Sequence, residues 1–287
     1  MATSVPLYTV QEVPNKGAGL IATTAIARGT RILLESPLIK VPFRGHDTSQ
    51  HRTEIKDAIS ALSQDQRTQF FALHNSHKKY GEIEGRFRTN GFPLGGSKLT
   101  EVGIFCDWSR LNHSCIPNAH FNWNDNLKQL TVHALRDIAE DEEITISYLD
   151  AHKHYLARTV QLLKDFGFIC YCSLCSLPSA DRQASDERCN EIQEIRTSLL
   201  DWETSFTPLQ ALDAAYRLLK LLGSEGVTGK HTREAICFAF EMALLVGDVE
   251  KAKGFASQAA ESIKMIEGAD SPAAKEWLAF ASDPSQY

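Results

Sequence analysis

The sequence lacks the features that mark a membrane-spanning or secreted protein. No apolar run approaches the roughly 20 residues that a transmembrane helix needs. The opening stretch, MATSVPLYTVQEVPNKG, has no basic segment followed by an apolar one, which a secretory signal requires. We therefore expect an intracellular protein, cytoplasmic or nuclear, that makes no membrane contact.

An excess of positive charge is also missing. The 287 residues include 30 Lys and Arg against 36 Asp and Glu, a formal net charge of −6. No basic stripe with interleaved aromatic residues occurs, as nucleic-acid binding would favour, so no direct nucleic-acid partner is expected. A local basic patch stays compatible with this charge. The 43% hydrophobic content is ordinary for one large domain or two smaller ones.

Cysteines are few, and their number is odd. Three of the seven fall within six residues, as Cys170-x-Cys172-x-x-Cys175, which does not fit a secreted disulfide framework. Closed zinc sites use four ligands in a tetrahedron and favour thiolate sulfur. We expect one structural zinc ion, with Cys115 of RLNHSCIPN as the leading candidate for the fourth ligand. The alternative is a group of buried free thiols. The remaining cysteines are expected to be isolated: Cys106, Cys189 and Cys237.

The first part of the chain has mainly β-type patterns with one helical interruption. Residues 5–43 are rich in β-branched residues and turns, whereas residues 51–80 carry apolar residues at helical spacing. Glycines in residues 81–99 predict turns. Residues 101–111 and 129–138 return to β-type runs. DEEITISYLD predicts an acidic turn and a short strand that ends at Tyr148.

The last part of the chain predicts helices. Residues 176–190 are polar and are interpreted as a linker. Residues 232–268 predict two helices with Gly247 and Asp248 between them, and Ser271 and Pro272 predict a further helix start. The small-residue spacing is similar to a tetratricopeptide (TPR) unit, without a clean repeat. These helices are a possible surface for a protein partner.

Four motifs together resemble a SET-domain lysine methyltransferase of the SMYD-like branch. They are NKGAGL (15–20), LNHSCIPN (111–118), EEITISYLD (142–150) and FGFICYCSLC (166–175). Their order matches the family's, and NHSC with C-x-C-x-x-C is specific to it. Residues 40–100 contain no cysteine. The resemblance therefore implies that the MYND zinc finger of SMYD-like proteins is missing.

The resemblance implies an α+β fold of small β-sheets tied by a pseudoknot. A SET domain would span residues 1–178, with a helical insert at about 46–105 and a post-SET zinc loop at 166–178. An all-α, TPR-like region would follow over residues 186–287. The implied methyl donor is S-adenosylmethionine, and the implied substrate is a protein that presents a lysine.

The resemblance also implies a cofactor site. The KGAGL turn would bring bare backbone close to the cofactor, which suits glycine because it has no Cβ. The backbone of Lys16 and Ala18 would contact the methionine part, and the ring of Phe168 would stack on the adenine. The full set of expected cofactor contacts is Lys16, Gly17, Ala18, Gly19, Asn90, Asn112, His113, Tyr148 and Phe168.

Each of these assignments has a structural alternative. The glycine motif by itself would favour an ordinary hairpin turn, and Asn90 is equally compatible with an asparagine in a turn beside Gly91. His113 is also compatible with a structural role in the knot, and Phe168 with packing around the zinc loop. Phe92 could line a channel for the target lysine, although a place in the core is the preferred interpretation.

Tyr148 is the expected catalytic residue. Methyl transfer to an amine is a direct displacement, so the alignment of nucleophile, methyl carbon and leaving sulfur decides the rate. Phe166 would line the same channel, where related enzymes often carry tyrosine. The loss of that hydroxyl is expected to change how many methyl groups are added.

Two further functions stay open. A non-catalytic SET-type binding or scaffold module would keep the fold without turnover, and a methyltransferase could act on a small-molecule amine. The acidic residues at 137–143 could attract a basic substrate segment, although a solvated turn is the preferred interpretation. The leading prediction is an S-adenosylmethionine-dependent protein-lysine N-methyltransferase.

Overall fold

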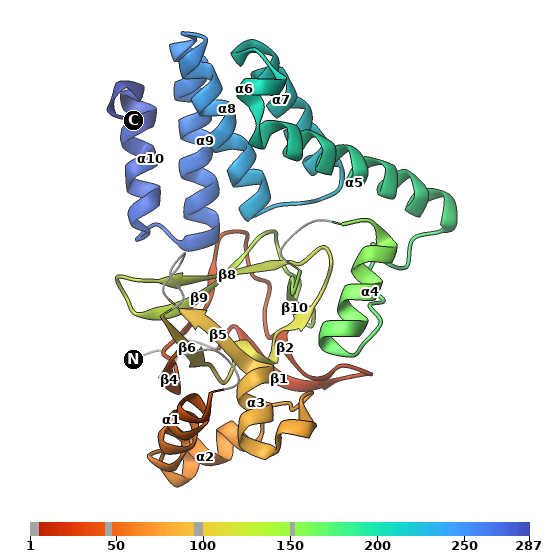
Figure 1. Ribbon diagram of the computed structural model, residues 1–287, viewed down its shortest axis with the longest axis vertical. Coiled ribbons are helices and arrows are strands. Elements are labelled where there is room, and N and C mark those ends of the chain that lie inside the picture. Colours follow the sequence, from red (N-terminus) through yellow and green to blue (C-terminus); the bar gives the residue numbers. More distant parts are fainter. Residues whose placement is uncertain (1–5, 44–47, 95–99, 150–152) are drawn as a thin grey trace.

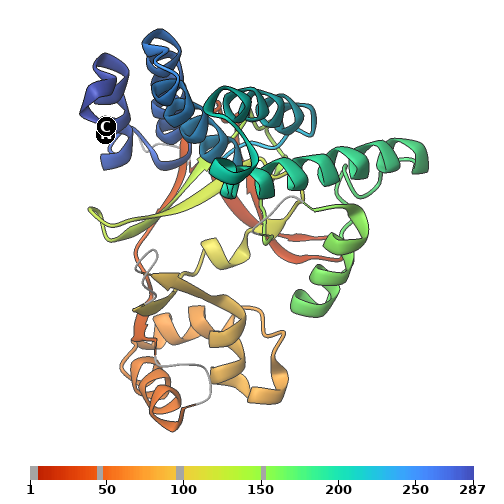
Figure 2. The ribbon, with the colours of Figure 1, turned by 45° about the horizontal axis from the view of Figure 1, so that its top comes forward.

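Three small β-sheets form the middle of the molecule, and helices lie at both ends. A computed structural model describes residues 6–43, 48–94, 100–149 and 153–287. The helices of the insert (orange) lie at the opposite end of the sheets from the C-terminal helices (blue) in both ribbon views (Figures 1 and 2). This arrangement confirms the predicted α+β class with small sheets, an inserted helical segment and an all-α C-terminal region.

The sheets are short and mostly antiparallel. The orders of the strands are β1-β2-β10-β7, β3-β9-β8 and β4-β6-β5. Their apolar side chains fill one core over the first two sheets and a second core beneath the third. The strands are β1 (Tyr8–Val13), β2 (Gly17–Ala22), β3 (Arg31–Glu35), β4 (Ile39–Pro42), β5 (Gly91–Leu94), β6 (Glu101–Ile104), β7 (Asn112–His113), β8 (Ala119–Asn124), β9 (Gln129–Ala134) and β10 (Glu143–Ile146).

The inserted segment is more helical than its glycines predict. Helices α1 (Ser49–Ser60) and α2 (Gln64–Phe71) follow the apolar spacing seen in the sequence. The short helix η1 (Lys78–Tyr80) and helix α3 (Glu82–Asn90) come next. The prediction of turns throughout 81–99 was therefore wrong for 82–94, which form α3 and strand β5. Residues 95–99 lie outside the described residues.

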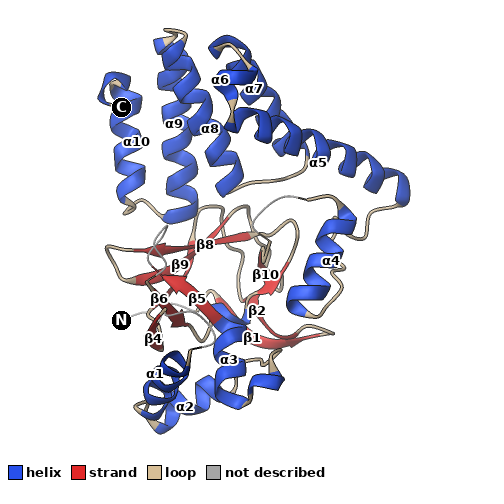
Figure 3. Cartoon of the chain, in the orientation of Figure 1, coloured by secondary structure: helices blue, strands red, loops and turns tan. Residues whose placement is uncertain are grey.

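The C-terminal region is a series of helices that pack on their neighbours in the sequence (Figure 3). Ser271 and Pro272 begin α10, and Gly247 and Asp248 lie between α8 and α9, both as predicted; Asp248 also caps α9. The linker prediction for 176–190 was wrong, because helix α5 begins at Ser179. The helices are α5 (Ser179–Leu200), α6 (Trp202–Ser205), α7 (Pro208–Ser224), α8 (Lys230–Leu245), α9 (Val249–Glu267), α10 (Pro272–Ser282) and η3 (Pro284–Gln286). Within the described residues, no helix combines the length and apolarity that crossing a membrane would take.

Helix α9 packs against strands β8 and β9 and thereby joins the helical region to the sheets. Arg31 at the start of β3 forms an ion pair with Asp270, three residues past the end of α9. The loop between α7 and α8 comes close to β8, since a Cβ at Gly229 would lie 3.5 Å from the ring of His120. The helices therefore cover the sheet whose strands flank the site described next.

Candidate active site and metal centre

The NHSC motif and the motif that ends in Tyr148 are joined by a parallel strand pair. Thr145 of β10 pairs with Asn112 of β7, and Ile146 pairs with His113. The backbone N–H of Ser114 continues the ladder by donating to the Ile146 carbonyl. Tyr148, two residues beyond β10, is therefore held beside the NHSC segment.

The side chain of Asn112 has a fixed orientation. Its Nδ2 lies 3.3 Å from the Ala18 carbonyl and 2.9 Å from Oε1 of Glu143, and both of these atoms can only accept hydrogen bonds. The amide nitrogen must therefore face them, which leaves Oδ1 as an acceptor with no hydrogen-bond partner among the described residues. A carbonyl oxygen in this half-buried position suits an ammonium group.

Glu143 links Asn112 to the first glycine motif. Its Oε2 lies 2.5 Å from Nζ of Lys16, and its side chain is 17% exposed. The backbone N–H of Lys16 donates to the Val13 carbonyl, so Lys16 can offer a ligand only its carbonyl from the backbone. The sequence did not indicate a role for Glu143, because its acidic run is typical of a solvated turn. That interpretation was wrong for this residue and for Glu142, whose carboxylate binds Arg136 and Asn118.

Gly19 packs where no side chain fits. A Cβ at this position would lie 2.6 Å from Cγ2 of Val13, 2.9 Å from Nδ2 of Asn112 and 3.2 Å from Oε1 of Glu143. Gly17 has φ +73°, a conformation that L side chains rarely adopt. The two glycines thus serve different purposes, one in the turn and one in the close approach of β2 to Asn112.

The hydroxyl of Tyr148 is oriented by a backbone carbonyl. It donates a 2.6 Å hydrogen bond to the oxygen of Leu111, directly before Asn112. Burial, and then the charge of Glu143, raises the pKa of Tyr148 above its ordinary value. The phenol therefore stays protonated, and its oxygen lone pairs remain available to accept a hydrogen bond from a substrate.

Aromatic rings surround Tyr148. The ring centroids of Phe166 and His113 lie 4.9 Å and 5.3 Å from that of Tyr148, and the ring of Phe168 lies 6.0 Å from His113. Phe166 ends helix α4 (Tyr155–Phe166), and Gly167 follows in the left-handed conformation with φ +78°. That turn brings Phe168 back toward His113. The FGF triplet thus places two rings at the site.

The imidazole of His113 connects Tyr148 to the cysteines. Its Nδ1 accepts a 3.0 Å hydrogen bond from the backbone N–H of Tyr148. In a neutral imidazole the proton must then lie on Nε2, which is 3.3 Å from Sγ of Cys115. His113 is 5% exposed, so this bond is shielded from water.

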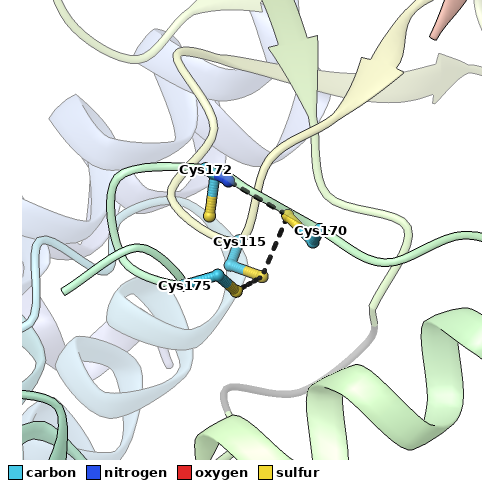
Figure 4. A group of neighbouring side chains, drawn as sticks. All are labelled: Cys115, Cys170, Cys172 and Cys175. Carbon is cyan, nitrogen blue, oxygen red and sulfur yellow. Dashed lines mark hydrogen bonds between the residues drawn. The ribbon is translucent and has the colours of Figure 1, made fainter. Parts of the chain in front are cut away.

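Four cysteines converge as the sequence predicts (Figure 4). The sulfurs of Cys115, Cys170, Cys172 and Cys175 all lie within 4.8 Å of one another, and the cysteines are free. The Cys115 sulfur is 3.5 Å from that of Cys175 and 4.0 Å from that of Cys170. A zinc ion with Zn–S bonds of ~2.3 Å separates its sulfurs by about 3.8 Å in a tetrahedron. The donor set therefore fits a tetrahedral metal ion.

Hydrogen bonding within this cysteine cluster favours thiolate formation at two of its members. A bond with Cys115 lowers the pKa of Cys170 below its ordinary value and that of Cys172 to about 5. The other three cysteines lie outside the cluster, and burial raises the pKa of each to about 11: Cys106, Cys189 and Cys237. Within the cluster, the hydrogen bond with Cys170 raises the pKa of Cys115, and the pKa of Cys175 is raised as well, so the four thiols differ in how readily they lose a proton.

Two predicted site residues lie in other surroundings. Nδ2 of Asn90 donates to the carbonyls of His74 and Arg86, each at 2.8 Å, so its amide closes the end of α3. Phe92 packs at 5.1 Å from Trp108 in an aromatic cluster, which favours the core interpretation. Within the described residues, no hydrogen bond or ring contact joins either of them to Asn112, His113 or Tyr148.

Comparisons with known proteins give concordant results. The SET-domain model matches residues 17–149. The histone-lysine N-methyltransferase set5 of Schizosaccharomyces pombe is 34% identical over 283 residues, which cover 98% of this chain and 85% of set5. The human histone-lysine N-methyltransferase SMYD3 is 36% identical over 110 residues, 37% of this chain and 25% of SMYD3. The zebrafish (Danio rerio) protein-lysine N-trimethyltransferase SMYD5 is 39% identical over 90 residues, 30% of this chain and 22% of SMYD5.

Proposed function

Because this chain belongs to the SET-domain family, we propose that it is a protein-lysine N-methyltransferase whose methyl donor is S-adenosylmethionine. The observation that carries the proposal is the pairing of β7 with β10. It sets the free Oδ1 of Asn112 and the oriented hydroxyl of Tyr148 on neighbouring segments. Oδ1 of Asn112 can bind the methyl donor, and the hydroxyl of Tyr148 can orient the amine that receives the methyl group.

The residues around Asn112 fit the cofactor. S-adenosylmethionine supplies an electrophilic methyl group on a positively charged sulfur and also carries an α-ammonium group. The free Oδ1 of Asn112 can accept a hydrogen bond from that ammonium group. The turn beside it offers backbone for the methionine part of the cofactor, from Lys16, Gly17, Ala18 and Gly19. The backbone of His113 can serve the adenine edge, and Phe168 offers a ring for stacking.

Tyr148 acts by orientation. Its raised pKa excludes a phenolate base at neutral pH. The amine must therefore lose its proton before the reaction, although a free lysine has a pKa of ~10.4. The rings of Phe166 and Phe168 beside Tyr148 provide apolar surroundings that disfavour the ammonium form. The Tyr148 oxygen can then accept an N–H of the neutral amine and hold it in line for transfer.

The cysteine cluster would hold one structural zinc ion. Cys115 lies just after β7, and the other three ligands lie at 170–175, shortly after Phe168, so a shared ion would fix Phe166 and Phe168 against His113 and Tyr148. In this proposal zinc takes no part in the transfer and serves only to complete the walls of the site.

The test is transfer of a labelled methyl group from S-adenosylmethionine into proteins of a cell extract. We expect the wild type to label at least one protein and Tyr148→Phe to reduce labelling about 100-fold, because a misaligned amine reacts that much more slowly. Binding of S-adenosylmethionine, measured by calorimetry, should change little. Tyr171→Phe is the matched control, because that side chain is 80% exposed.

Each of the remaining outcomes would contradict a different part of the proposed function. Equal labelling by wild type and Tyr148→Phe would remove Tyr148 from its role. Cofactor binding without labelling of any extract would favour the non-catalytic module, and labelling of small molecules alone would favour a metabolite amine. Absence of cofactor binding by the wild type would overturn the assignment itself.

Other parts of the sequence-based interpretation stay proposals. We place the end of the SET domain at Pro178, because α5 begins at Ser179; the helical region would then start before residue 186. A protein partner on the C-terminal helices and residence in the cytoplasm or nucleus are likewise proposed, and await binding and localisation experiments.

A further inference from the structure

A buried arginine lies against the cysteine cluster. Arg158 on α4 is 1% exposed and is among the largest fully buried side chains. One guanidinium nitrogen donates to the carbonyl of Lys153, and Nη2 lies 3.9 Å from Sγ of Cys175. Nε has no partner. Within the described residues, no carboxylate lies within ion-pair distance of this guanidinium.

Such a charge needs compensation. Arginine does not lose its proton in proteins, so Arg158 stays cationic even when it is buried. Burying an uncompensated charge lowers the stability of the fold by several kcal/mol, which is the penalty typical of an ion taken out of water. Among the described residues, the groups beside this guanidinium that can supply the compensating negative charge are the sulfurs of the cluster.

Three of the cluster sulfurs each face a different N–H donor. Nε2 of His113 faces Cys115, the backbone N–H of Cys172 lies 3.4 Å from Sγ of Cys170, and Arg158 faces Cys175. Three of the four sulfurs thus have an N–H donor directed at them from outside the group of thiols. Charged acceptors form stronger hydrogen bonds than neutral ones, so this arrangement is suited to thiolates.

We propose that Arg158 is a positioning residue of the cysteine cluster, whose buried guanidinium offsets the excess negative charge of a tetrathiolate centre and so strengthens its hold on a divalent metal. Four thiolates and one Zn²⁺ carry a formal charge of −2, which Arg158 reduces to −1. The inference rests on the metal site of the proposed function and extends it to a residue that donates no ligand atom.

The same side chain also fixes the geometry of the loop. By binding the Lys153 carbonyl and Cys175 together, Arg158 holds the start of α4 against the last of the four ligands. Lysine would keep the charge but lose the fork that reaches both groups. Methionine would keep much of the side-chain volume and lose the charge. Comparing the two substitutions therefore separates the effect of the charge from that of packing.

The test measures zinc retention rather than methyl transfer. The full chain is purified without added chelator, its zinc content is determined by elemental analysis, and the transfer of zinc to a chromogenic chelator is timed. We expect Arg158→Met to lower zinc affinity 10- to 100-fold, as the loss of groups that support metal ligands does. The zinc affinity of Arg158→Lys should lie between that of Arg158→Met and that of the wild type.

The matched control is Arg182→Met. The guanidinium of Arg182 lies 4.5 Å from the ring centroid of Tyr155, so this change removes another arginine where α5 meets α4, away from the sulfurs. It should release zinc as the wild type does. Circular dichroism on all variants checks that they fold.

The outcomes separate the two proposals. Equal zinc release by wild type, Arg158→Met and Arg182→Met would overturn the role of Arg158 and leave the metal site standing. A wild type that carries and binds no zinc would overturn the metal site, and the role of Arg158 with it, whatever the Tyr148 experiment gives. If Arg158→Met does not fold, Arg158→Lys is compared with Cys175→Ser, which lacks one of the four ligands. Zinc release from Arg158→Lys as fast as from Cys175→Ser would overturn the role of the charge.

Discussion

Single atoms decide how the candidate site is coupled to the cysteine cluster. His113 accepts from the Tyr148 backbone through Nδ1 and presents Nε2 to the sulfur of Cys115. The two nitrogens have opposite roles, so one neutral tautomer satisfies both contacts. A shift of Cys115 would therefore be transmitted to the residue that we propose orients the amine.

A phenylalanine at position 166 is expected to leave more room around the target amine than a tyrosine would. The Phe166 ring lies 4.9 Å from that of Tyr148 and is 38% exposed, so an added hydroxyl would reach the space beside the Tyr148 oxygen. We expect Phe166→Tyr to shift the product toward fewer methyl groups per lysine, because the new hydroxyl and its bound water occupy that space. Mass spectrometry of methylated peptides measures the distribution.

Phe71→Tyr provides the control for this change, since Phe71 lies on α2 and is similarly exposed at 40%. It should leave the distribution unchanged. Identical methylation states from wild type and Phe166→Tyr would show that residue 166 does not limit the number of methyl groups.

At the scale of elements, strand β2 is packed too closely for any side chain at Gly19. A methyl group there would displace Val13 or turn the Asn112 amide away from Ala18 and Glu143. We expect Gly19→Ala to cost about 1–3 kcal/mol of stability, as overpacking does. Cofactor affinity should fall at least tenfold because Asn112 loses its orientation. Thermal unfolding and calorimetric titration with S-adenosylmethionine measure the two effects.

Gly254→Ala is the matched control in helix α9. Nothing lies within 4 Å of a Cβ at that position, and alanine is favoured over glycine in a helix by about 1 kcal/mol. This variant should therefore be slightly more stable and bind the cofactor normally. Unchanged cofactor binding by Gly19→Ala would exclude the glycine motif from the pocket.

The sequence indicates some elements of the site better than others, for physical reasons. Thiol ligands must cluster to bind a metal, so the spacing of Cys170, Cys172 and Cys175 is informative without a structure. Gly85 was misleading, because it lies inside α3, where a Cβ would lie 2.5 Å from the Asn75 side chain. Glu143 resembled the exposed acids beside it. Its role depends on Lys16, 127 residues away, which no local pattern reveals.

At the scale of the whole molecule, the helical region is joined to the sheets through an interface that contains neutral histidines. Nε2 of His133 accepts a 3.1 Å hydrogen bond from Nε of Arg31, and burial followed by the charge of Arg31 lowers the pKa of His133 to about 4. Burial, and next the charge of Arg233 on α8, lowers the pKa of His120 to about 4. Other titratable groups act on these two histidines: Asp270, Lys230 and His231.

These shifts give stability a defined dependence on pH. The folded pKa values lie below the ordinary value of 6.5, so between about pH 6.5 and 4 the unfolded chain binds protons that the folded chain excludes. The stabilisation is complete above pH 6.5 and is lost as the pH falls to 4. For His133, which is 1% exposed, the loss is about 3 kcal/mol. Calorimetric melting temperatures measured across this range should fall by several degrees.

Carboxylates also titrate near pH 4, so the contribution of the interface is isolated by substitution. In His133→Gln the amide oxygen can still accept from Arg31, yet nothing titrates, and the fall in melting temperature between pH 6.5 and 4 should become shallower. His74→Gln, at an exposed position of the inserted segment, should leave the wild-type slope unchanged. Equal slopes for wild type and His133→Gln would show that His133 does not couple protonation to the docking of the helices on the sheets.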